Sequence, residues 1–192
     1  MKKSKFRMTN KQARYAALAG IVCLLLLLID QLTKAWAAAG FVRQSDYFLG
    51  LNRVSYAENH GMAYGIFDDN RAAMIAITVL TVFMIIGIVI IFFTLFKKNK
   101  PAQMCLAIIE AGAIGNLIDR LYFGFVRDFL DMHPMGFGVC NPADWCISLG
   151  ALALVIVILF IGPTSMFPLT RKWREEAKRL DEQKKKEKKK RS

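Results

Sequence analysis

The amino-acid sequence predicts an all-α membrane protein with four transmembrane helices and a small β-rich external segment. Hydrophobic residues make up 55% of the 192, which is more than an ordinary soluble domain carries. Four apolar segments each approach the roughly 20 residues that a helix needs to cross the hydrocarbon core of a bilayer. These segments cover residues 15–39, 72–96, 102–118 and 146–166.

The placement of the basic residues predicts how the chain is oriented in the membrane. Of 27 Lys and Arg residues, six lie in 1–14, three in 97–100 and twelve in 171–192. Only five lie in 40–71 and 119–145 together. The positive-inside rule therefore places both termini and the 97–100 turn in the cytoplasm. An even number of spans agrees with this arrangement.

The formal net charge of +12 does not by itself indicate a nucleic-acid partner. No aromatic residues, on which bases would stack, are interleaved with the charges of the basic run at residues 184–191. We expect residues 171–192 to form a basic cytoplasmic tail, a solvated arm beside anionic lipid headgroups. Residues 1–170 then form one membrane domain, in which we see no repeat and no Pro/Gly/Ser-rich linker.

The first apolar segment also resembles a secretory signal, with a basic start and a small-residue stretch at residues 37–39. However, Asp30 and Lys34 separate the apolar run from those alanines. The charge pattern along the rest of the chain also requires a first span. We therefore expect this segment to be a retained transmembrane helix.

The external segment 40–71 supplies the expected β-structure. Residues 48–56 have the aromatic and β-branched content of short strands, and Gly61 and Gly65 follow them. We call this segment the cradle and expect it to roof the helices at the membrane interface. Residues 119–145 form the second external segment.

Two aspartates near the outer ends of the last two spans are the best candidates for chemistry. Asp128 lies within Val126–Phe129, and Asp144 stands at the start of the last apolar segment. Ionisable groups at membrane depth are costly, which favours a functional interpretation. Two carboxylates that meet can share a proton and activate water, as in an aspartic protease.

The two acids are expected to differ in protonation. Asn141 and Pro142 suit the N-cap and the first position of a helix, so capping alone would also account for Asp144. The helix dipole favours an ionised Asp144. Asp128 has apolar neighbours and should be protonated more readily.

Two other groups of polar residues each lie on one helix face. The sequence leaves two interpretations open for each group. Asp30 and Lys34 are four residues apart, and they form either a local ion pair with Lys34 extended to water or a ligand-positioning group. Gly112, Asn116 and Arg120 line one face of the third span. Arg120 either caps carbonyls at the helix end or offers its five donors to the site.

Two further acids and four possible metal ligands remain unassigned. Asp119 belongs either to the acid pair or to the surroundings of Arg120, and Glu110 is either a protonated packing residue or a functional one. The possible ligands match no standard zinc spacing, so a metal site is not expected, and the sequence leaves a disulfide between the two cysteines undecided. They are Cys140, Cys146, His60 and His133.

Five sequence blocks resemble the lipoprotein signal peptidases, the bacterial signal peptidase II family. Each block alone is a weak signal, but all five occur in the family's order between four spans. The resemblance covers residues from about 15 to 166. The blocks are Asp30–Lys34, Asn59–Gly65, Gly115–Arg120, Val126–Phe129 and Asn141–Asp144.

The resemblance implies an aspartic endopeptidase of the bacterial inner membrane. It would remove signal peptides from diacylglyceryl-modified prolipoproteins by cutting just before the lipidated cysteine, using water and no metal or cofactor. Asp128 and Asp144 correspond to the catalytic pair, which faces the outer leaflet under the cradle. Residues that correspond to substrate-binding or positioning groups are Asp30, Lys34, Asn59, Gly61, Asn116, Arg120 and Asn141.

Other functional classes remain as alternatives. A proton-linked membrane transporter would use Asp30, Glu110, Asp128 and Asp144 as a relay, although no repeated halves or broken helices support it. A metal-dependent lipid transferase would hold magnesium with the acids and would be inactivated by a chelator. A purely structural assembly factor would leave the placed polar groups unexplained.

Overall fold

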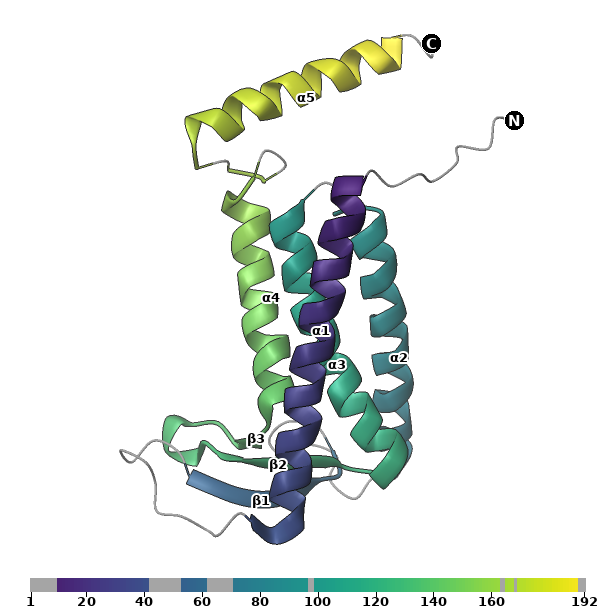
Figure 1. Ribbon diagram of the computed structural model, residues 1–192, viewed down its shortest axis with the longest axis vertical. Coiled ribbons are helices and arrows are strands. Elements are labelled where there is room, and N and C mark those ends of the chain that lie inside the picture. The colour runs from purple at the N-terminus through teal and green to yellow at the C-terminus, as the bar shows by residue number, and fades with distance from the viewer. Residues whose placement is uncertain are drawn as a thin grey trace, which may run out of the picture.

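A four-helix bundle forms the body of the computed structural model, which describes residues 10–41, 53–61, 71–96, 99–162, 165–167 and 169–189. A three-stranded sheet covers one end of the bundle, and a fifth helix lies at the other end (Figure 1). The bundle helices are α1 (Asn10–Trp36), α2 (Arg71–Phe93), α3 (Lys100–Phe123) and α4 (Pro142–Phe160). The remaining elements are β1 (Arg53–Asn59), β2 (Val126–Asp131), the 3₁₀ turn His133–Met135, β3 (Val139–Cys140) and α5 (Arg171–Lys189).

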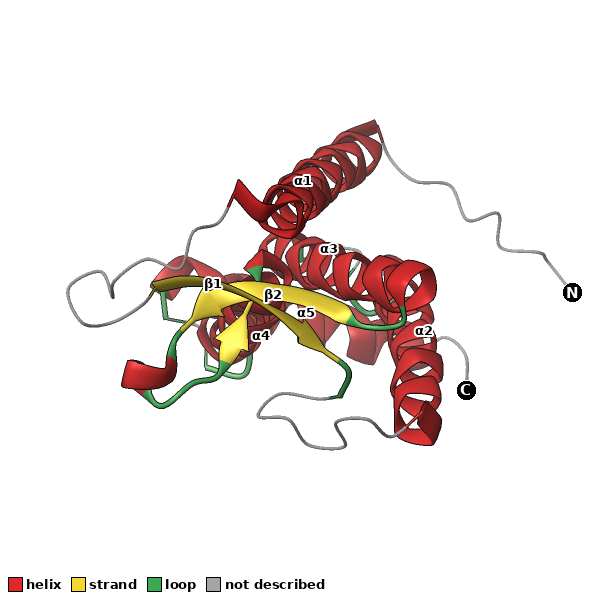
Figure 2. Ribbon diagram, turned by 90° about the horizontal axis from the view of Figure 1, so that it is seen from below, coloured by secondary structure: helices red, strands yellow, loops and turns green. Residues whose placement is uncertain are grey.

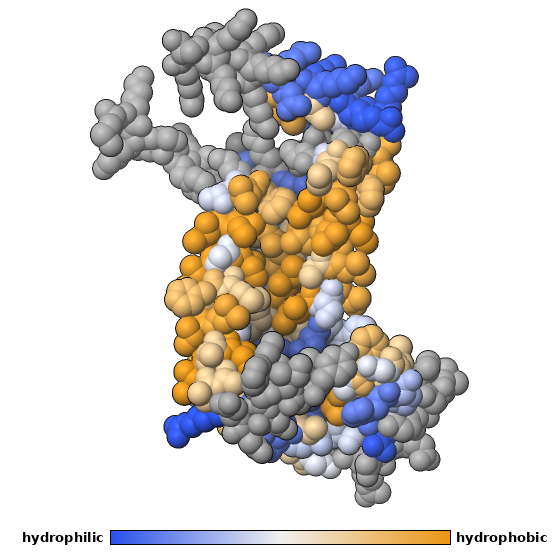
Figure 3. Space-filling model, turned by 180° about the vertical axis from the view of Figure 1, so that it is seen from behind, coloured by the Kyte–Doolittle hydropathy of each residue, from blue (hydrophilic) through white to orange (hydrophobic). Residues whose placement is uncertain are grey.

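The four bundle helices are the predicted membrane spans. Each is long and apolar enough to cross a bilayer, and α1 continues through a π-helical turn, Ala37–Phe41. Large apolar side chains point outward along them, with Leu24 66% and Phe83 67% exposed. Figure 3 shows the resulting broad hydrophobic band between two polar ends. This confirms the predicted class of fold, since such a surface is stable only in lipid.

Helix α3 is the centre of the bundle and is mostly buried, whereas α2 has no buried residue. Small side chains let α4 and α1 approach α3 closely. A Cβ atom added at Gly112 would overlap the backbone oxygen of Ala143, and one at Gly115 would overlap the carboxylate of Asp30. Because these two glycines have no side chain, α4 and α1 can pack closely against α3, which brings the polar residues of the site together.

The ends of α3 have recognisable caps. The Asn99 side chain accepts a hydrogen bond from the backbone N–H of Ala102 at 3.1 Å, and Pro101 occupies the first turn, where its missing N–H costs nothing. Gly124, with φ 79°, ends the helix and donates its N–H to the carbonyl of Arg120. The chain then turns directly into β2.

The sheet is antiparallel in the order β1-β2-β3 and lies across the bundle end (Figure 2). Asn59 pairs with Val126 and Ala57 with Asp128, with a bulge between Val54 and Ala57. The prediction that the cradle 40–71 supplies the β-structure is incomplete. In the described part of 40–71 only β1 is a strand. Since a strand needs hydrogen-bonding partners, the sheet is completed by β2 and β3, which come from the second external segment.

Residues 171–189 of the predicted basic tail form helix α5. Strong helix formers dominate this segment. An exposed ion pair between Arg171 Nε and Glu175 Oε1, at 3.0 Å and one turn apart, adds slightly to its stability.

Candidate active site

Asp128 and Asp144 are both bound to one residue, Asn141. The side-chain amide of Asn141 donates to Asp128 Oδ1 at 2.5 Å, and its backbone N–H donates to Asp144 Oδ2 at 3.1 Å. Asp128 comes from the middle of β2, while Asp144 lies in the first turn of α4. A strand and a helix start thus bring the two carboxylates to the same place.

The capping box at the start of α4 explains why Asn141 can serve both acids. Its side-chain oxygen accepts the N–H of Asp144 at 3.1 Å, while Asp144 accepts the backbone N–H of Asn141. Its amide nitrogen then remains free to reach Asp128. Helix capping and the placing of the acids are therefore compatible.

Two further amides complete the hydrogen bonding of the acid pair. Asn116 Nδ2 donates to Asp144 Oδ1 at 2.8 Å, and Asn59 Nδ2 donates to Asp128 Oδ2 at 2.9 Å. The buried backbone N–H of Gly61 holds the Asn59 oxygen at 3.0 Å, which fixes the direction of that amide. All four carboxylate oxygens consequently face neutral donors rather than a cation.

Burial raises the pKa of Asp128 to about 7, and the negative charge of Asp144 adds to this effect. The hydrogen bonds from Asn59 and Asn141 act in the opposite direction. Because the side chain is only 2% exposed, desolvation outweighs them. Asp128 therefore keeps its proton to a higher pH than an ordinary aspartate does.

Among the described residues, Lys34 is the only cation that bonds directly to Asn116. Its Nζ lies 2.8 Å from Asn116 Oδ1, 3.0 Å from Asp30 Oδ2 and 3.5 Å from Asp119 Oδ2. The predicted local ion pair with Asp30 is present, but Lys34 does not extend to water. It is fully buried, because its partners lie inside the bundle.

Asp30 connects α1 to the start of α4. Its Oδ1 accepts the backbone N–H of Ala143 at 3.0 Å, one of the N–H groups that a helix start leaves unpaired. The same carboxylate binds Lys34 and fills the space beside Gly115. Asp30 thereby holds in place the helix turn that carries Asp144.

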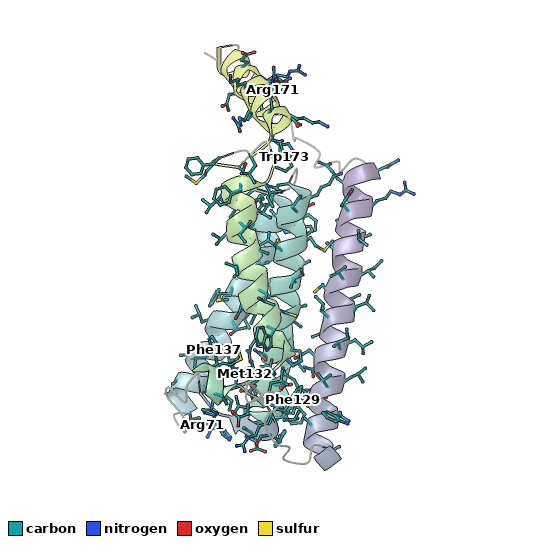
Figure 4. The ribbon with its side chains drawn as sticks, turned by 90° about the vertical axis from the view of Figure 1, so that its left-hand side faces the viewer. Arg71, Phe129, Met132, Phe137, Arg171 and Trp173 are labelled. Atoms are coloured by element: carbon teal, nitrogen blue, oxygen red, sulfur yellow. The ribbon has the colours of Figure 1, made fainter. Side chains whose placement is uncertain are left out.

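A cavity of about 460 Å³ opens beside Asp144, and Asp128 is not among the residues that line it. The polar lining residues are Asn59, Asn116, Arg120, Asp144 and Ser148. Arg120 does not act as a helix cap; its backbone carbonyl is capped by Gly124, and its buried Nε has no partner among the described residues. The apolar lining includes Val126, Met132, Phe137, Trp145 and Ile147. Met132 and Phe137 lie near the sheet end of the bundle (Figure 4).

Asp119 does not join the acid pair. Its carboxylate accepts the backbone N–H of Arg127 at 3.0 Å and the guanidinium Nη2 of the same residue at 2.7 Å. Arg127 Nη2 also donates to Gln31 Oε1 at 3.0 Å, and Gln31 Nε2 donates to Asp30 Oδ2 at 3.0 Å. Gln31 and Arg127 were not predicted as site residues, although both stand within the five sequence blocks, next to predicted site residues.

These contacts clamp the strand position next to Asp128. For the peptidase activity that the sequence resemblance implies, Arg127→Met should therefore impair catalysis more than substrate binding. We expect a loss of about a hundredfold in kcat with little change in KM, because a carboxylate displaced by about 1 Å reacts poorly. Steady-state cleavage kinetics would measure this. Arg127→Lys should recover part of the rate, whereas Arg53→Met, at the far end of β1, is the control. An unchanged kcat in Arg127→Met would contradict the clamp.

The cysteines and histidines considered for zinc do not gather. His133 bonds Asp131 at 2.5 Å, His60 lies 3.7 Å from Glu58, and both Cys140 and Cys146 are free thiols. Burial and the charge of Asp144 raise the pKa of Cys140 to about 11. Within the described segments, no three His, Cys, Asp or Glu side chains are grouped so as to hold a metal ion.

The chain is similar to a set of bacterial membrane enzymes. The lipoprotein signal peptidase of Clostridium tetani is 34% identical over 150 residues, covering 72% of this chain and 90% of that protein. That of Streptococcus pyogenes is 34% identical over 140 residues, covering 70% and 88%. A solved bacterial membrane enzyme matches with a TM-score of 0.66 at 25% identity, over 74% of this chain and 88% of the other.

The family comparison agrees with the five sequence blocks. Residues 22–160 match the signal peptidase (SPase) II family, and this range contains all four bundle helices in whole or large part, together with the acid pair. It ends before α5, which lies outside the match. The chain therefore belongs to the signal peptidase II family.

Proposed function

We propose that the protein removes signal peptides from diacylglyceryl-modified prolipoproteins by hydrolysing the peptide bond just before the lipidated cysteine. One observation carries the catalytic part of this proposal: Asn141 bonds both the buried carboxylate of Asp128 and the half-buried carboxylate of Asp144, and Asp144 lines a cavity. Two acids in unlike environments can divide the roles of acid and base.

In the proposed reaction, ionised Asp144 accepts a proton from a water molecule whose oxygen attacks the scissile carbonyl carbon. Protonated Asp128 donates its proton to the carbonyl oxygen, which stabilises the tetrahedral intermediate. The C–N bond then breaks as the proton taken up by Asp144 passes to the leaving amine, and a hydroxyl proton of the intermediate returns to Asp128. The signal peptide leaves with a new carboxyl terminus, and the mature lipoprotein retains the lipidated cysteine as its first residue.

The other site residues bind or position in this scheme. Arg120, which lines the cavity and offers five donors, would bind a substrate carbonyl oxygen. Asn59, Gly61, Asn116 and Asn141 orient the two acids. Asp30 and Lys34 hold the supporting helices. The apolar wall would accommodate the acyl chains and the signal helix.

We further propose that the enzyme is a multi-pass protein of the bacterial inner membrane with both termini cytoplasmic. The positive-inside rule supports this orientation and places the sheet and the acid pair toward the outer leaflet. Membrane lipids would contact the apolar helix surface. Residues 1–170 would form the peptidase domain and 171–192 a basic cytoplasmic tail, and we propose neither a cofactor nor a nucleic-acid partner.

The proposed function is tested with a lipid-modified precursor peptide and its unmodified twin. Purified protein should cleave the modified peptide before its cysteine, and mass spectrometry of the two products locates the bond. The unmodified twin should be cleaved far more slowly. A chelator should leave the rate unchanged, whereas loss of activity with the chelator would favour the metal-dependent transferase. Failure to cleave the modified peptide would overturn the proposal.

The rate of cleavage should fall as pH rises through about 7. The pKa of Asp128 is raised to about 7, so its protonated, proton-donating form is present below that pH and is lost above it. At saturating substrate we expect kcat to decrease roughly tenfold per pH unit once the pH is well above 7. A kcat that stayed constant from about pH 6 to about pH 9 would contradict the acid role of Asp128.

No observation favours the proton-linked transporter. A relay needs acids that exchange protons freely, whereas Asp30 is ion-paired with Lys34 and bonded to the backbone of Ala143. Glu110 lies apart from these acids. It lines a small apolar pocket together with Cys23 and Leu106. Its buried Oε2 has no partner among the described residues, which suits a protonated packing residue.

A further inference from the structure

The chain after α4 turns back along the last turn of that helix. Three backbone N–H groups of the following segment donate to three carbonyls of α4 that a helix end would otherwise leave unpaired. The donor and acceptor pairs are Met166 and Ile158 at 3.0 Å, Phe167 and Leu159 at 2.7 Å, and Leu169 and Phe160 at 3.3 Å. The segment is thus held at the depth of the final turn of a membrane span.

The side chains of this segment are suited to lipid rather than to water. Met166, Phe167 and Leu169 are 67%, 61% and 61% exposed, although all three are large and apolar. Exposed apolar groups at the end of a span belong in the interfacial region of a bilayer. Since α5 begins two residues after Leu169, its first turn is held at the membrane surface.

Helix α5 runs across the bundle end instead of continuing α4 (Figure 1). Trp173, Ala177 and Leu180 share one face, at the four- and three-residue spacing of a helix. Of the side chains from 171 to 183, these three are half-buried and all others are exposed. Figure 4 shows Trp173 between α5 and the bundle end. A tryptophan on such a face is typical of a helix that lies in the headgroup region.

The other faces of α5 carry charges of both signs: basic residues outnumber acidic ones by five to four over 171–183 and by seven to one over 184–191. Arg171, Lys172, Arg174, Lys178 and Arg179 are exposed, and residues 171–192 contain twelve basic but only five acidic residues. The apolar face is narrow, so insertion of three side chains alone would bind weakly. Basic side chains beside an anionic leaflet supply the missing attraction.

We propose that α5 is an interfacial helix that binds anionic phospholipid headgroups on the leaflet opposite the sheet. Trp173, Ala177 and Leu180 face the acyl chains, and the basic side chains contact the headgroup phosphates. This inference is independent of the peptidase reaction, because the acid pair lies at the other end of the bundle. It also goes beyond a solvated tail, because it predicts a fixed depth for Trp173.

The test uses the full chain in lipid nanodiscs, either of phosphatidylcholine alone or with added phosphatidylglycerol. Amide hydrogen exchange of residues 171–183 should slow by about tenfold or more when the anionic lipid is present. High salt should reverse most of this protection. Both leaflets of a nanodisc are accessible, so the result does not depend on the proposed orientation.

Matched variants separate the two contributions. Trp173→Ser and the double variant K178E/R179E should each lose most of the lipid-dependent protection. Trp36→Ser, at the far end of α1, and Arg14→Glu, an exposed basic residue of α1, should leave it unchanged. Unaltered unfolding temperatures would show that the variants keep the bundle intact.

Three results would overturn the proposal. The first is equal exchange of α5 in the two kinds of nanodisc. The second is full protection in Trp173→Ser and K178E/R179E. The third is protection that appears only when an RNA or DNA oligonucleotide is added, which would assign the basic faces to nucleic acid instead.

Discussion

Asp128→Asn and Asp144→Asn should each lower the rate of precursor cleavage by about three orders of magnitude or more, while the protein still inserts into membranes. In the proposed reaction, one acid must accept a proton and the other must donate one, and an amide does neither at neutral pH. The two losses should not add in the double variant, because the pair acts as a unit. Single-turnover cleavage of the lipid-modified precursor measures these rates.

The control for this experiment is Glu58→Gln, an exposed carboxylate on β1 beside Asn59, which should cleave at the normal rate. Asp144 also caps α4 through the backbone N–H of Asn141, so its variant needs a check of thermal unfolding. Asparagine is itself a good capping residue, and we expect only a small loss of stability. Normal cleavage by either single variant would exclude the pair as the catalytic groups.

Lys34→Met should destabilise the protein by about 3–5 kcal/mol. The lysine is fully buried, and its Nζ lies within 4 Å of two carboxylates, those of Asp30 and Asp119. Without the ammonium group, Asp30 loses its only charged partner among the described contacts, and a buried unpaired charge is costly. Unfolding of the protein in detergent micelles, followed by circular dichroism, measures the change in free energy.

A second substitution tests the cause of this loss. The double variant K34M/D30N removes both charges and should recover part of the stability. Lys172→Met, an exposed residue of α5, should change the free energy of unfolding by less than about 0.5 kcal/mol. Equal stability of Lys34→Met and the unaltered protein would mean that the ion pairs around Lys34 contribute little.

The four membrane spans were predictable because crossing a bilayer depends on local length and composition. The predicted segments and the observed helices agree to within a few residues at most ends, and the family comparison confirmed the family that the five blocks indicated. The helix start at Asn141 was predictable for the same reason, since the N-cap, the proline and the acid all act within one helical turn. The catalytic roles of Asp128 and Asp144 remain a proposal.

The sheet and the polar network were harder to predict because they join distant parts of the chain. Residues 48–56 indicated a strand, but nothing local showed that β1 would pair with β2, some 70 residues later. The backbone hydrogen bonds that hold Met166, Phe167 and Leu169 against the last turn of α4 also depend on where the fold places that helix end. Pairing of this kind is decided by which unpaired backbone groups the fold brings together.

By itself, the sequence determined the membrane-spanning helices, and it predicted their direction of insertion and the two acids of the proposed catalytic pair. Only the tertiary structure decided that Lys34 points inward, that Asp119 binds Arg127 instead of joining the pair, and that Asn141 serves both carboxylates. The physical reason is that a buried charge or amide takes whichever partner is within reach, and reach is set by packing between helices that are far apart in the chain.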